Sequence, residues 1–314
     1  MLTVICEAPG TLRAEDRPMP IPAPGEVLLR VKRVGICGTD FHIFAGRQPY
    51  LIYPRVMGHE LSGIVAEAPN GSRLAAGDMA YVMPYLSCGG CVACRLGRTN
   101  CCVDLQVLGV HRDGAFTEYL CVPEGFVHKA EGVSLDHAAM IEFLAIGAHA
   151  VRRAQVHAGQ RVLVAGAGPI GMGAMIFSSL RGATVVALDS RADRLAFCTQ
   201  RLGTEASVTV ADGDVEQLAA LSSNEFFDVV FDATGNPAAM ERGFRFVAHA
   251  GTYVLISVVS ADIKFNDPEF HKRETTLLGS RNATSEDFET VVQDRKSTRL
   301  NSSHGGISRM PSSA

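Results

Sequence analysis

The chain has 314 residues, of which 47% are hydrophobic and 20% are charged, and its net charge at pH 7 is −4. These values are typical of a soluble globular protein of about two domains, and they give no reason to expect nucleic acid or an acidic membrane surface as a partner. The sequence begins without an export signal and contains nine cysteines, which indicates the reducing cytoplasm, where clustered thiols bind metal more often than they form disulfides.

The first part of the chain, residues 1–145, is predicted to be a β-rich domain. Short segments rich in valine, leucine and isoleucine predict strands at 27–34, 62–66 and 79–83. Prolines at alternate positions predict an extended linker over 18–24. Short strands separated by glycine and proline favour a small antiparallel barrel.

Residues 35–60 hold a candidate catalytic zinc site. Cys37 and His59 each lie beside a glycine, so two tight turns can present a thiolate and an imidazole to one ion that keeps an open position. Asp40 is a candidate to accept the second ring N–H of such a histidine. Thr39 and His42 follow the thiolate closely and are candidates to carry a proton from a substrate alcohol towards water.

A second metal site is predicted in a lobe at about residues 86–104. Cys88, Cys91, Cys94 and Cys102 have the spacing of a closed four-cysteine zinc site, which is structural because it has no open position. Cys101 is adjacent to Cys102, so spacing alone leaves the fourth ligand open between these two residues.

Residues 146–280 are predicted to form a dinucleotide-binding domain. An apolar strand at 162–165 runs into a glycine-rich turn and then a helix, the context in which such a turn binds a pyrophosphate at the helix N-terminus. The first glycine makes the tight turn, the second lets the phosphates approach, and the third lets helix and strand pack closely. The predicted contacts in this turn are Gly166, Gly168, Pro169, Ile170 and Gly171.

Asp189 ends a second predicted strand, 184–188, and would hydrogen-bond the adenosine ribose, which favours NAD over NADP. Arg194 lies nearby and is a further cofactor contact. Strands predicted at 206–210, 227–232 and 251–256 complete a doubly wound parallel sheet. Thr234 follows one of them, at a carboxyl end where the cofactor crevice is expected.

These motifs together resemble the zinc-dependent medium-chain alcohol/polyol dehydrogenases over residues 1 to about 292. Further segments, such as 53–60 and 267–272, are similar to bacterial sugar-acid dehydrogenases of the L-galactonate 5-dehydrogenase type. The resemblance implies a GroES-like barrel domain joined to a Rossmann domain. It also implies two zinc ions per chain, NAD as cofactor, and a dimer or tetramer.

The resemblance assigns Glu142 as the third catalytic zinc ligand and Glu60 as a carboxylate beside the metal. From the residues alone, Glu142 could equally be an acidic residue at a helix N-terminus. The implied reaction transfers a hydride from a secondary hydroxyl of a sugar acid or polyol to NAD. Rival substrates are L-threonine, sorbitol-like polyols, L-idonate and L-gulonate. A sugar-acid carboxylate would need a cationic partner, and the candidates are Arg47, Arg112 and Arg281, each of which could also be an ordinary surface charge.

The end of the chain is expected to be foreign. Residues 294–314 can be back-translated into both halves of a common sequencing-library adapter in one reading frame, whereas a disordered serine-rich tail would explain only the composition. Residues 281–293 would then begin a truncated return to the first domain. The alternative functional interpretation is a catalytically silent zinc-binding fragment.

Overall fold

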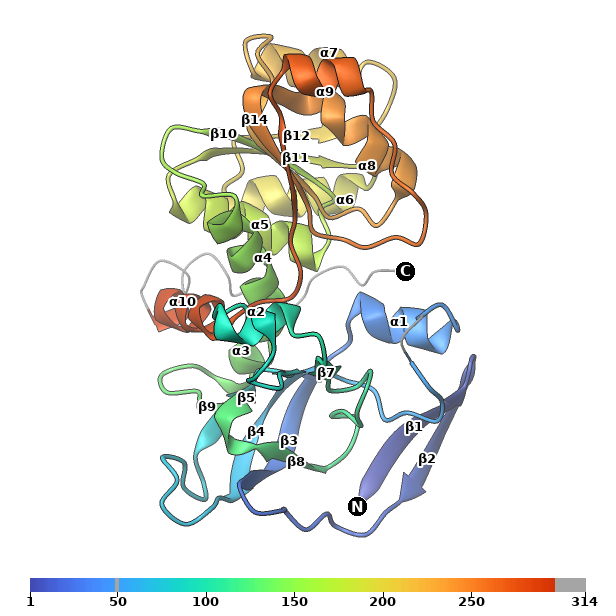
Figure 1. Ribbon diagram of the computed structural model, residues 1–314, viewed down its shortest axis with the longest axis vertical. Coiled ribbons are helices and arrows are strands. Elements are labelled where there is room, and N and C mark those ends of the chain that lie inside the picture. Colours follow the sequence, from blue (N-terminus) through green and yellow to red (C-terminus); the bar gives the residue numbers. More distant parts are fainter. Residues whose placement is uncertain (49–50, 297–314) are drawn as a thin grey trace. The chain divides into compact units, whose positions relative to one another are not determined.

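The computed structural model describes residues 1–48 and 51–296, and these residues form two compact units (Figure 1). The first unit contains Met1–Glu142 and the segment that starts at Thr284, and the second contains Phe143–Ala283. The tail predicted to be foreign is residues 294–314, and most of it, residues 297–314, lies outside the described residues.

The first unit is built on an antiparallel sheet of five strands among the described residues, in the order β8-β3-β4-β5-β9. It confirms the strands predicted at 27–34, 62–66 and 79–83. Buried apolar side chains such as Val27, Leu29 and Val65 pack together and form the core of this unit. The strands are β3 (Glu26–Gly35), β4 (Glu60–Glu67), β5 (Met79–Val82), β8 (Tyr119–Pro123) and β9 (Val127–Lys129).

Two short antiparallel pairs and several helices complete the first unit. The sequence did not predict the hairpin β1–β2, because almost every side chain of β2 is exposed and the strand has no apolar alternation. The paired strands are β1 (Leu2–Ala8) with β2 (Thr11–Asp16), and β6 (Tyr85–Leu86) with β7 (Gln106–Val107). The helices are α1 (Gly38–Phe44), α2 (Val92–Arg95), η1 (Thr99–Cys101), η2 (Glu124–Phe126), α3 (Leu135–Ala139) and α10 (Ser285–Lys296).

The second unit contains the predicted parallel sheet, with the order β12-β11-β10-β13-β14-β15 in the described chain. Strands β11 and β12 follow β10 on one side of it, and β13, β14 and β15 follow on its other side. The strand order therefore reverses between β10 and β13. Ligands of such sheets bind beyond the carboxyl ends at this reversal. The strands are β10 (Arg161–Ala165), β11 (Thr184–Asp189), β12 (Ala206–Thr209), β13 (Phe227–Asp232), β14 (Val247–Leu255) and β15 (Thr276–Gly279).

Helices connect these parallel strands, as a parallel sheet requires. Buried residues such as Leu163, Val230 and Tyr253 form the core of this unit. The helices are α5 (Pro169–Leu180), α6 (Ala192–Phe197), η3 (Cys198–Leu202), α7 (Asp214–Leu221), α8 (Pro237–Gly243), η4 (Phe244–Phe246) and α9 (Asp267–Lys272). Helix α4 (Ile141–Arg153) precedes these strands; its first two residues belong to the first unit and the rest to the second. Throughout the residues that the structure describes, no helix has both the length and the apolar character needed to cross a membrane.

A column of aromatic rings joins α10 to the sheet of the first unit. Tyr81 of β5 stacks on His128 of β9 with ring centroids 5.3 Å apart, and on Phe288 of α10 at 6.2 Å. Within the described chain, His128 Nε2 is buried without a hydrogen-bond partner. Burial, with a smaller contribution from the charge of Arg73, lowers the pKa of His128 from its ordinary 6.5 to about 4.

This depressed pKa predicts a loss of stability in acid. Between pH 6.5 and pH 4 the unfolded chain binds a proton at residue 128 that the folded protein does not, so the free energy of unfolding falls as the pH falls through this window. One such group contributes a slope of up to about 1.4 kcal/mol per pH unit. Urea unfolding across this range should show that His128→Gln removes this part of the slope. The exposed His157 provides the control His157→Gln, and equal slopes in both variants would refute the assignment.

Candidate active site

Cys37 lies between the end of β3 and the first turn of α1, where it is the N-cap residue. The Cys37 backbone N–H donates to Asp40 Oδ2 at 2.8 Å, and the Gly58 N–H donates to Asp40 Oδ1 at 3.3 Å. Through these two hydrogen bonds, the buried Asp40 connects the cysteine turn to the glycine that precedes His59. The contacts of Asp40 are thus with backbone amides, in place of the histidine ring contact that the sequence suggested.

A cluster of potential metal ligands forms at this junction. Donor atoms of Cys37, His59 and Glu60 all lie within 4.8 Å of one another. Glu60 is the first residue of β4 and pairs directly with Gly35 at the end of β3. A Cβ atom on residue 35 would lie 2.1 Å from Glu60 Oε2, so the absence of a side chain at Gly35 leaves the space that this carboxylate fills.

Glu142 lies beside this cluster but is not part of the three-residue group. It occupies the first turn of α4, and its Oε1 accepts a hydrogen bond from the hydroxyl of Tyr85 in β6. Both side chains are buried. Burial raises the pKa of Tyr85 well above its ordinary value, so the phenol keeps its proton and acts as the donor.

Burial also acts on the acids around Cys37. It raises the pKa of the Cys37 thiol to about 11, that of Glu60 well above its ordinary value, and that of Glu142 in the same direction. Nearby acidic groups add to the increase for Cys37 and Glu60. A divalent cation reverses this effect because it favours ionised ligands.

The cluster fits zinc in its chemistry. A sulfur, an imidazole nitrogen and a carboxylate oxygen are the ligand types that zinc takes in catalytic sites, where a fourth position stays open. In the part of the chain that the structure describes, His59 Nδ1 and Glu142 Oε2 are buried without hydrogen-bond partners. Buried polar atoms are otherwise almost always paired, so these two indicate a missing ligand.

Thr39 and His42 are both in α1, three residues apart and therefore on the same side of this helix. Hydrogen bonds from Thr39 to the Cys37 thiol oppose the increase in its pKa. Thr39 is half-buried and His42 is exposed, so the two residues lead from the cluster to the surface.

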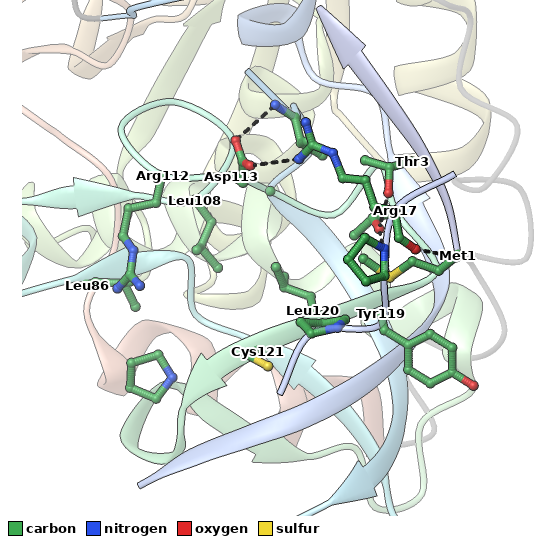
Figure 2. Close-up of a pocket in the computed structure, with 16 residues that line it drawn as sticks. Met1, Thr3, Arg17, Leu86, Leu108, Arg112, Asp113, Tyr119, Leu120 and Cys121 are labelled. Carbon is green, nitrogen blue, oxygen red and sulfur yellow. Dashed lines mark hydrogen bonds and ion pairs between the residues drawn. The ribbon is translucent and has the colours of Figure 1, made fainter. Parts of the chain in front are cut away.

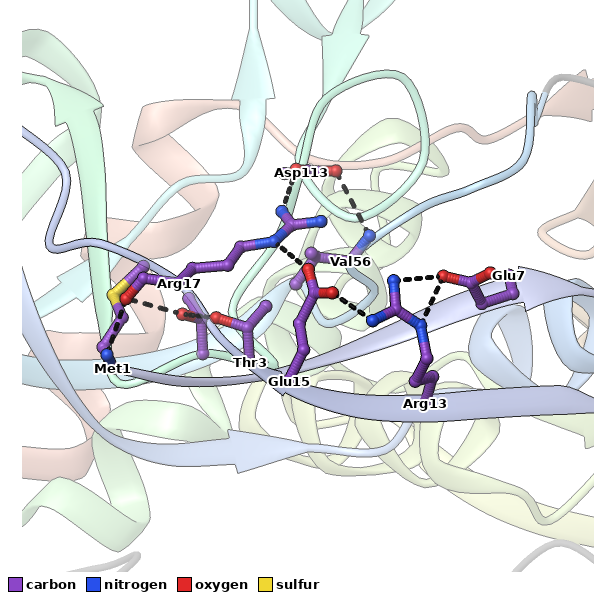
Figure 3. A network of polar contacts seen from close by, with 9 residues as sticks. Met1, Thr3, Glu7, Arg13, Glu15, Arg17, Val56 and Asp113 are labelled. Carbon is purple, nitrogen blue, oxygen red and sulfur yellow. Dashed lines mark hydrogen bonds and ion pairs between the residues drawn. The ribbon is translucent and has the colours of Figure 1, made fainter.

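The loop that carries His59 is held by a second loop. The backbone N–H groups of Gly114, Ala115 and Phe116 donate to the carbonyls of residues 56, 58 and 57 at 2.7–2.9 Å. Asp113 accepts from the Val56 N–H at 3.2 Å and also contacts Arg17 and Arg55. Figure 3 shows Asp113 between Arg17 and Val56.

Gly114 is essential to this contact between the loops. A Cβ atom there would lie 2.2 Å from the Gly58 carbonyl oxygen, so Gly114→Ala must push the two backbones apart and move His59. We expect this variant to lose zinc from the Cys37 cluster and about 2 kcal/mol or more of stability. Metal analysis and thermal unfolding would measure both effects.

Gly125→Ala is the matched control, because no described atom lies within 4 Å of a Cβ atom at that position. If the two alanine variants retain zinc equally well, the steric argument for Gly114 is wrong.

The four predicted cysteines of the second site lie together. The sulfurs of Cys88, Cys91, Cys94 and Cys102 are all within 4.8 Å of one another, whereas Cys101 is exposed and outside the group. Hydrogen bonds from backbone N–H groups lower the pKa of Cys91 to about 6, and the largest contribution comes from the N–H of Cys94. A thiol with a pKa below 7 is mostly ionised at neutral pH, and the thiolate is the form that binds a metal ion.

Serine replacement at the two adjacent cysteines should separate their roles. We expect Cys102→Ser to lose one zinc ion per chain and to unfold at a lower temperature, because a closed site contributes to folding. Cys101→Ser should keep the full zinc content and the parent melting temperature. The reverse pattern would assign Cys101 as the fourth ligand.

The predicted cofactor residues of the second unit meet at the carboxyl ends of β10, β11 and β13. Gly166 has φ +94°, and Gly171 lies so close to it that a Cβ atom on residue 171 would be 1.8 Å from the Gly166 carbonyl oxygen. Gly168 is the N-cap of α5 and is followed by Pro169 and then Ile170. A Cβ atom on Gly168 would meet only Arg194 Nη1, at 4.0 Å, among the described atoms, so the turn is open on this side.

Asp189 and Thr234 lie at the same edge of the sheet. Asp189 Oδ2 accepts from the Ala167 N–H at 2.6 Å, which holds the acid against the glycine turn, and Arg194 is 3.9 Å away. Thr234 donates through its N–H and hydroxyl to the buried Asp232, at 3.0 and 2.9 Å. Sequence reasoning missed Asp232 as the anchor of this turn, although its position at a strand end was a usable signal.

A pocket of about 340 Å³ lies in the first unit and contains none of the candidate metal ligands among its described lining residues (Figure 2). Apolar side chains such as Leu86, Leu108 and Leu120 line it together with Arg112 and Asp113. Arg112, a sequence candidate for the substrate carboxylate, therefore lines a space separate from the Cys37 cluster.

Two contributors to the cluster were missed in the sequence. Tyr85 contacts a carboxylate 57 residues away, and nothing in its local sequence indicates this contact. Gly35 was given no role from the sequence, and its importance comes from its pairing with Glu60 across two strands. In both cases the signal lies in the tertiary fold.

Comparison with known proteins agrees with the predicted resemblance to zinc-dependent dehydrogenases. The alcohol dehydrogenase GroES-like domain matches residues 23–132, and the zinc-binding dehydrogenase domain matches residues 169–296. The L-galactonate-5-dehydrogenase of Escherichia coli K12 is 45% identical over 93% of this chain and 86% of that protein. The 2-dehydro-3-deoxy-L-galactonate 5-dehydrogenase of Pseudoalteromonas atlantica is 32% identical over 87% of this chain and 80% of that protein.

A solved structure has a similar fold over most of the chain. It is that of a protein described as a short chain alcohol dehydrogenase from Escherichia coli CFT073, in complex with NADH. It has a TM-score of 0.87 and 31% identity, and the match covers 93% of this chain and 86% of the other.

Proposed function

The chain belongs to the zinc-binding alcohol dehydrogenase family, and we propose that it oxidises a secondary hydroxyl of an L-galactonate-like sugar acid with NAD as the hydride acceptor. As a member of this family it is an NAD-dependent zinc dehydrogenase of alcohols or polyols. The sugar-acid substrate is supported above all by the 45% identity to an L-galactonate-5-dehydrogenase across 93% of the chain. A second relative is also named as a dehydrogenase of a galactonate derivative.

Cys37 and His59 would hold the catalytic zinc with a carboxylate from Glu60 or Glu142. Support comes from the mixed donor set and from the two buried atoms that lack partners within the described structure. Zinc bound there would act as a Lewis acid on the substrate hydroxyl. The four-cysteine group would hold a second, structural zinc ion.

The substrate proton would leave through α1. Thr39 touches the thiol of Cys37 and would accept the proton, and His42 would pass it to water, because it is exposed one helical turn further along. The protein's other task is to hold the carbinol carbon against the cofactor, since hydride transfer requires close alignment.

NAD would bind in the second unit. The pyrophosphate would lie on the turn from Gly166 to Gly171, at the N-terminus of α5, and Asp189 would accept hydrogen bonds from the adenosine ribose. Arg194 and Thr234 would add contacts from the neighbouring strand ends. Gly168 supports this arrangement, because the space beside it is open.

We also propose residues 1–145 as the catalytic domain and 146–280 as the NAD-binding domain. The cytoplasm is the expected compartment, because all nine cysteines are free in the described structure. A dimer or tetramer is the expected assembly. Light scattering of the purified protein would measure it.

A substrate panel tests the proposed activity. With NAD, we expect the highest kcat/KM for L-galactonate, lower values for L-gulonate and L-idonate, and the lowest for sorbitol and L-threonine. The first place rests on the 45% identity to an L-galactonate-5-dehydrogenase. The last places follow because sorbitol lacks the carboxylate and L-threonine lacks the polyol chain. NADP should be the poorer acceptor, since its phosphate would meet Asp189. The assay follows NADH absorbance.

Preference for L-threonine or sorbitol would overturn the substrate assignment and leave the family assignment intact. A protein that binds zinc and NAD but oxidises none of these alcohols would support the alternative of a catalytically silent fragment.

A further inference from the structure

Tyr85 connects two elements of the candidate metal site that are distant in sequence. It lies in β6, and its hydroxyl donates to Oε1 of Glu142 in the first turn of α4. Tyr85 is 3% exposed and Glu142 is 4% exposed, so water does not compete for this contact. Across the described residues, Glu142 Oε2 has no partner. One carboxylate oxygen is therefore fixed and the other is available.

The phenol ring and the hydroxyl of Tyr85 have separable roles. The ring packs edge-on against Phe288 of α10, with centroids 6.1 Å apart, and this packing needs no hydroxyl. Tyr81 packs against the same Phe288 at 6.2 Å, as a stacked pair. The two tyrosines thus share an aromatic neighbour, and only Tyr85 has a hydrogen bond to a carboxylate in the described structure.

We propose that Tyr85 is a positioning residue of the metal site, whose hydroxyl fixes the Glu142 carboxylate so that Oε2 alone is directed to the metal held by Cys37 and His59. The terminal torsion of a glutamate is broad, and a free carboxylate can exchange its two oxygens by rotation. A hydrogen bond to one oxygen removes this freedom, as outer contacts of metal ligands do. The inference rests on the proposed function, since it requires a metal at this cluster.

The test compares Tyr85→Phe with Tyr81→Phe in the full-length protein. Cobalt(II) replaces zinc, and its visible d–d spectrum reports the geometry of the catalytic site. We expect Tyr85→Phe to change this spectrum and to weaken metal binding there by about 10–100-fold, measured by competition with a chelator. Tyr81→Phe should match the parent in both measurements. Metal at the four-cysteine site should be unchanged in both variants.

A double-mutant comparison keeps the test decisive if Tyr85→Phe loses stability. In a Glu142→Ala background, Tyr85→Phe should cause no further loss of metal affinity, because Tyr85 acts through that carboxylate. Additive losses would overturn the inference, as would a Tyr85→Phe spectrum and affinity equal to those of Tyr81→Phe. If the parent binds no metal outside the four-cysteine site, the proposed catalytic zinc site fails as well, so the two failures are distinguishable.

Discussion

The first unit depends on one electrostatic constraint, the burial of several acidic groups around an imidazole. Cys37, Glu60 and Glu142 all have raised pKa values because burial disfavours their charged forms. Buried carboxylates without a cation are costly, and two buried polar atoms of the cluster have no partner in the described chain. A divalent ion bound by these residues would satisfy the constraint, since it would compensate the charge and contact the two atoms.

The backbone around the cluster is organised to bring these groups together. Asp40 joins the cysteine turn to the glycine before His59 through two backbone amides. Gly35 and Gly114 allow close approaches of 2.1 and 2.2 Å, measured from the Cβ atoms that they lack. Their lack of a side chain matters more here than backbone flexibility, since neither has a positive φ. The sites of both units therefore use glycine for close packing, as Gly171 does beside Gly166.

Much of this arrangement could be predicted from the sequence because it is local. The four cysteines lie within 15 residues, and the dinucleotide turn lies between a strand and a helix that its own neighbours encode. The predicted strands of the parallel sheet lie where their apolar runs indicate. The hairpin β1–β2 was missed, because a polar, exposed strand has no periodic signal.

The remaining contacts depend on strand register and helix packing, which the sequence does not encode locally. The pairing of Gly35 with Glu60 is a consequence of the β3–β4 register, and the Tyr85–Glu142 bond joins a two-residue strand to a helix. The family resemblance therefore placed Glu60 and Glu142 near a metal, but it offered no basis for deciding how each is held. The structure answers this question through their different neighbours.

The two carboxylates are constrained by different physical effects, and this difference bears on the reaction. Four protein donors would close a tetrahedral zinc site, so a catalytic site that must accept a hydroxyl can use only one of these acids at a time. The Glu60 carboxylate occupies a space that exists because residue 35 has no side chain. Unlike Glu142, it is not held by a hydrogen bond from Tyr85. Glu142 accepts a hydrogen bond from Tyr85, worth about 1.5–3 kcal/mol for a charged acceptor, through Oε1, and it would keep this bond while Oε2 binds the metal. The Tyr85 hydroxyl would thus favour Glu142, bound through Oε2, as the protein ligand beside Cys37 and His59. Glu60 would then keep its own space, and the fourth position would stay free for the substrate.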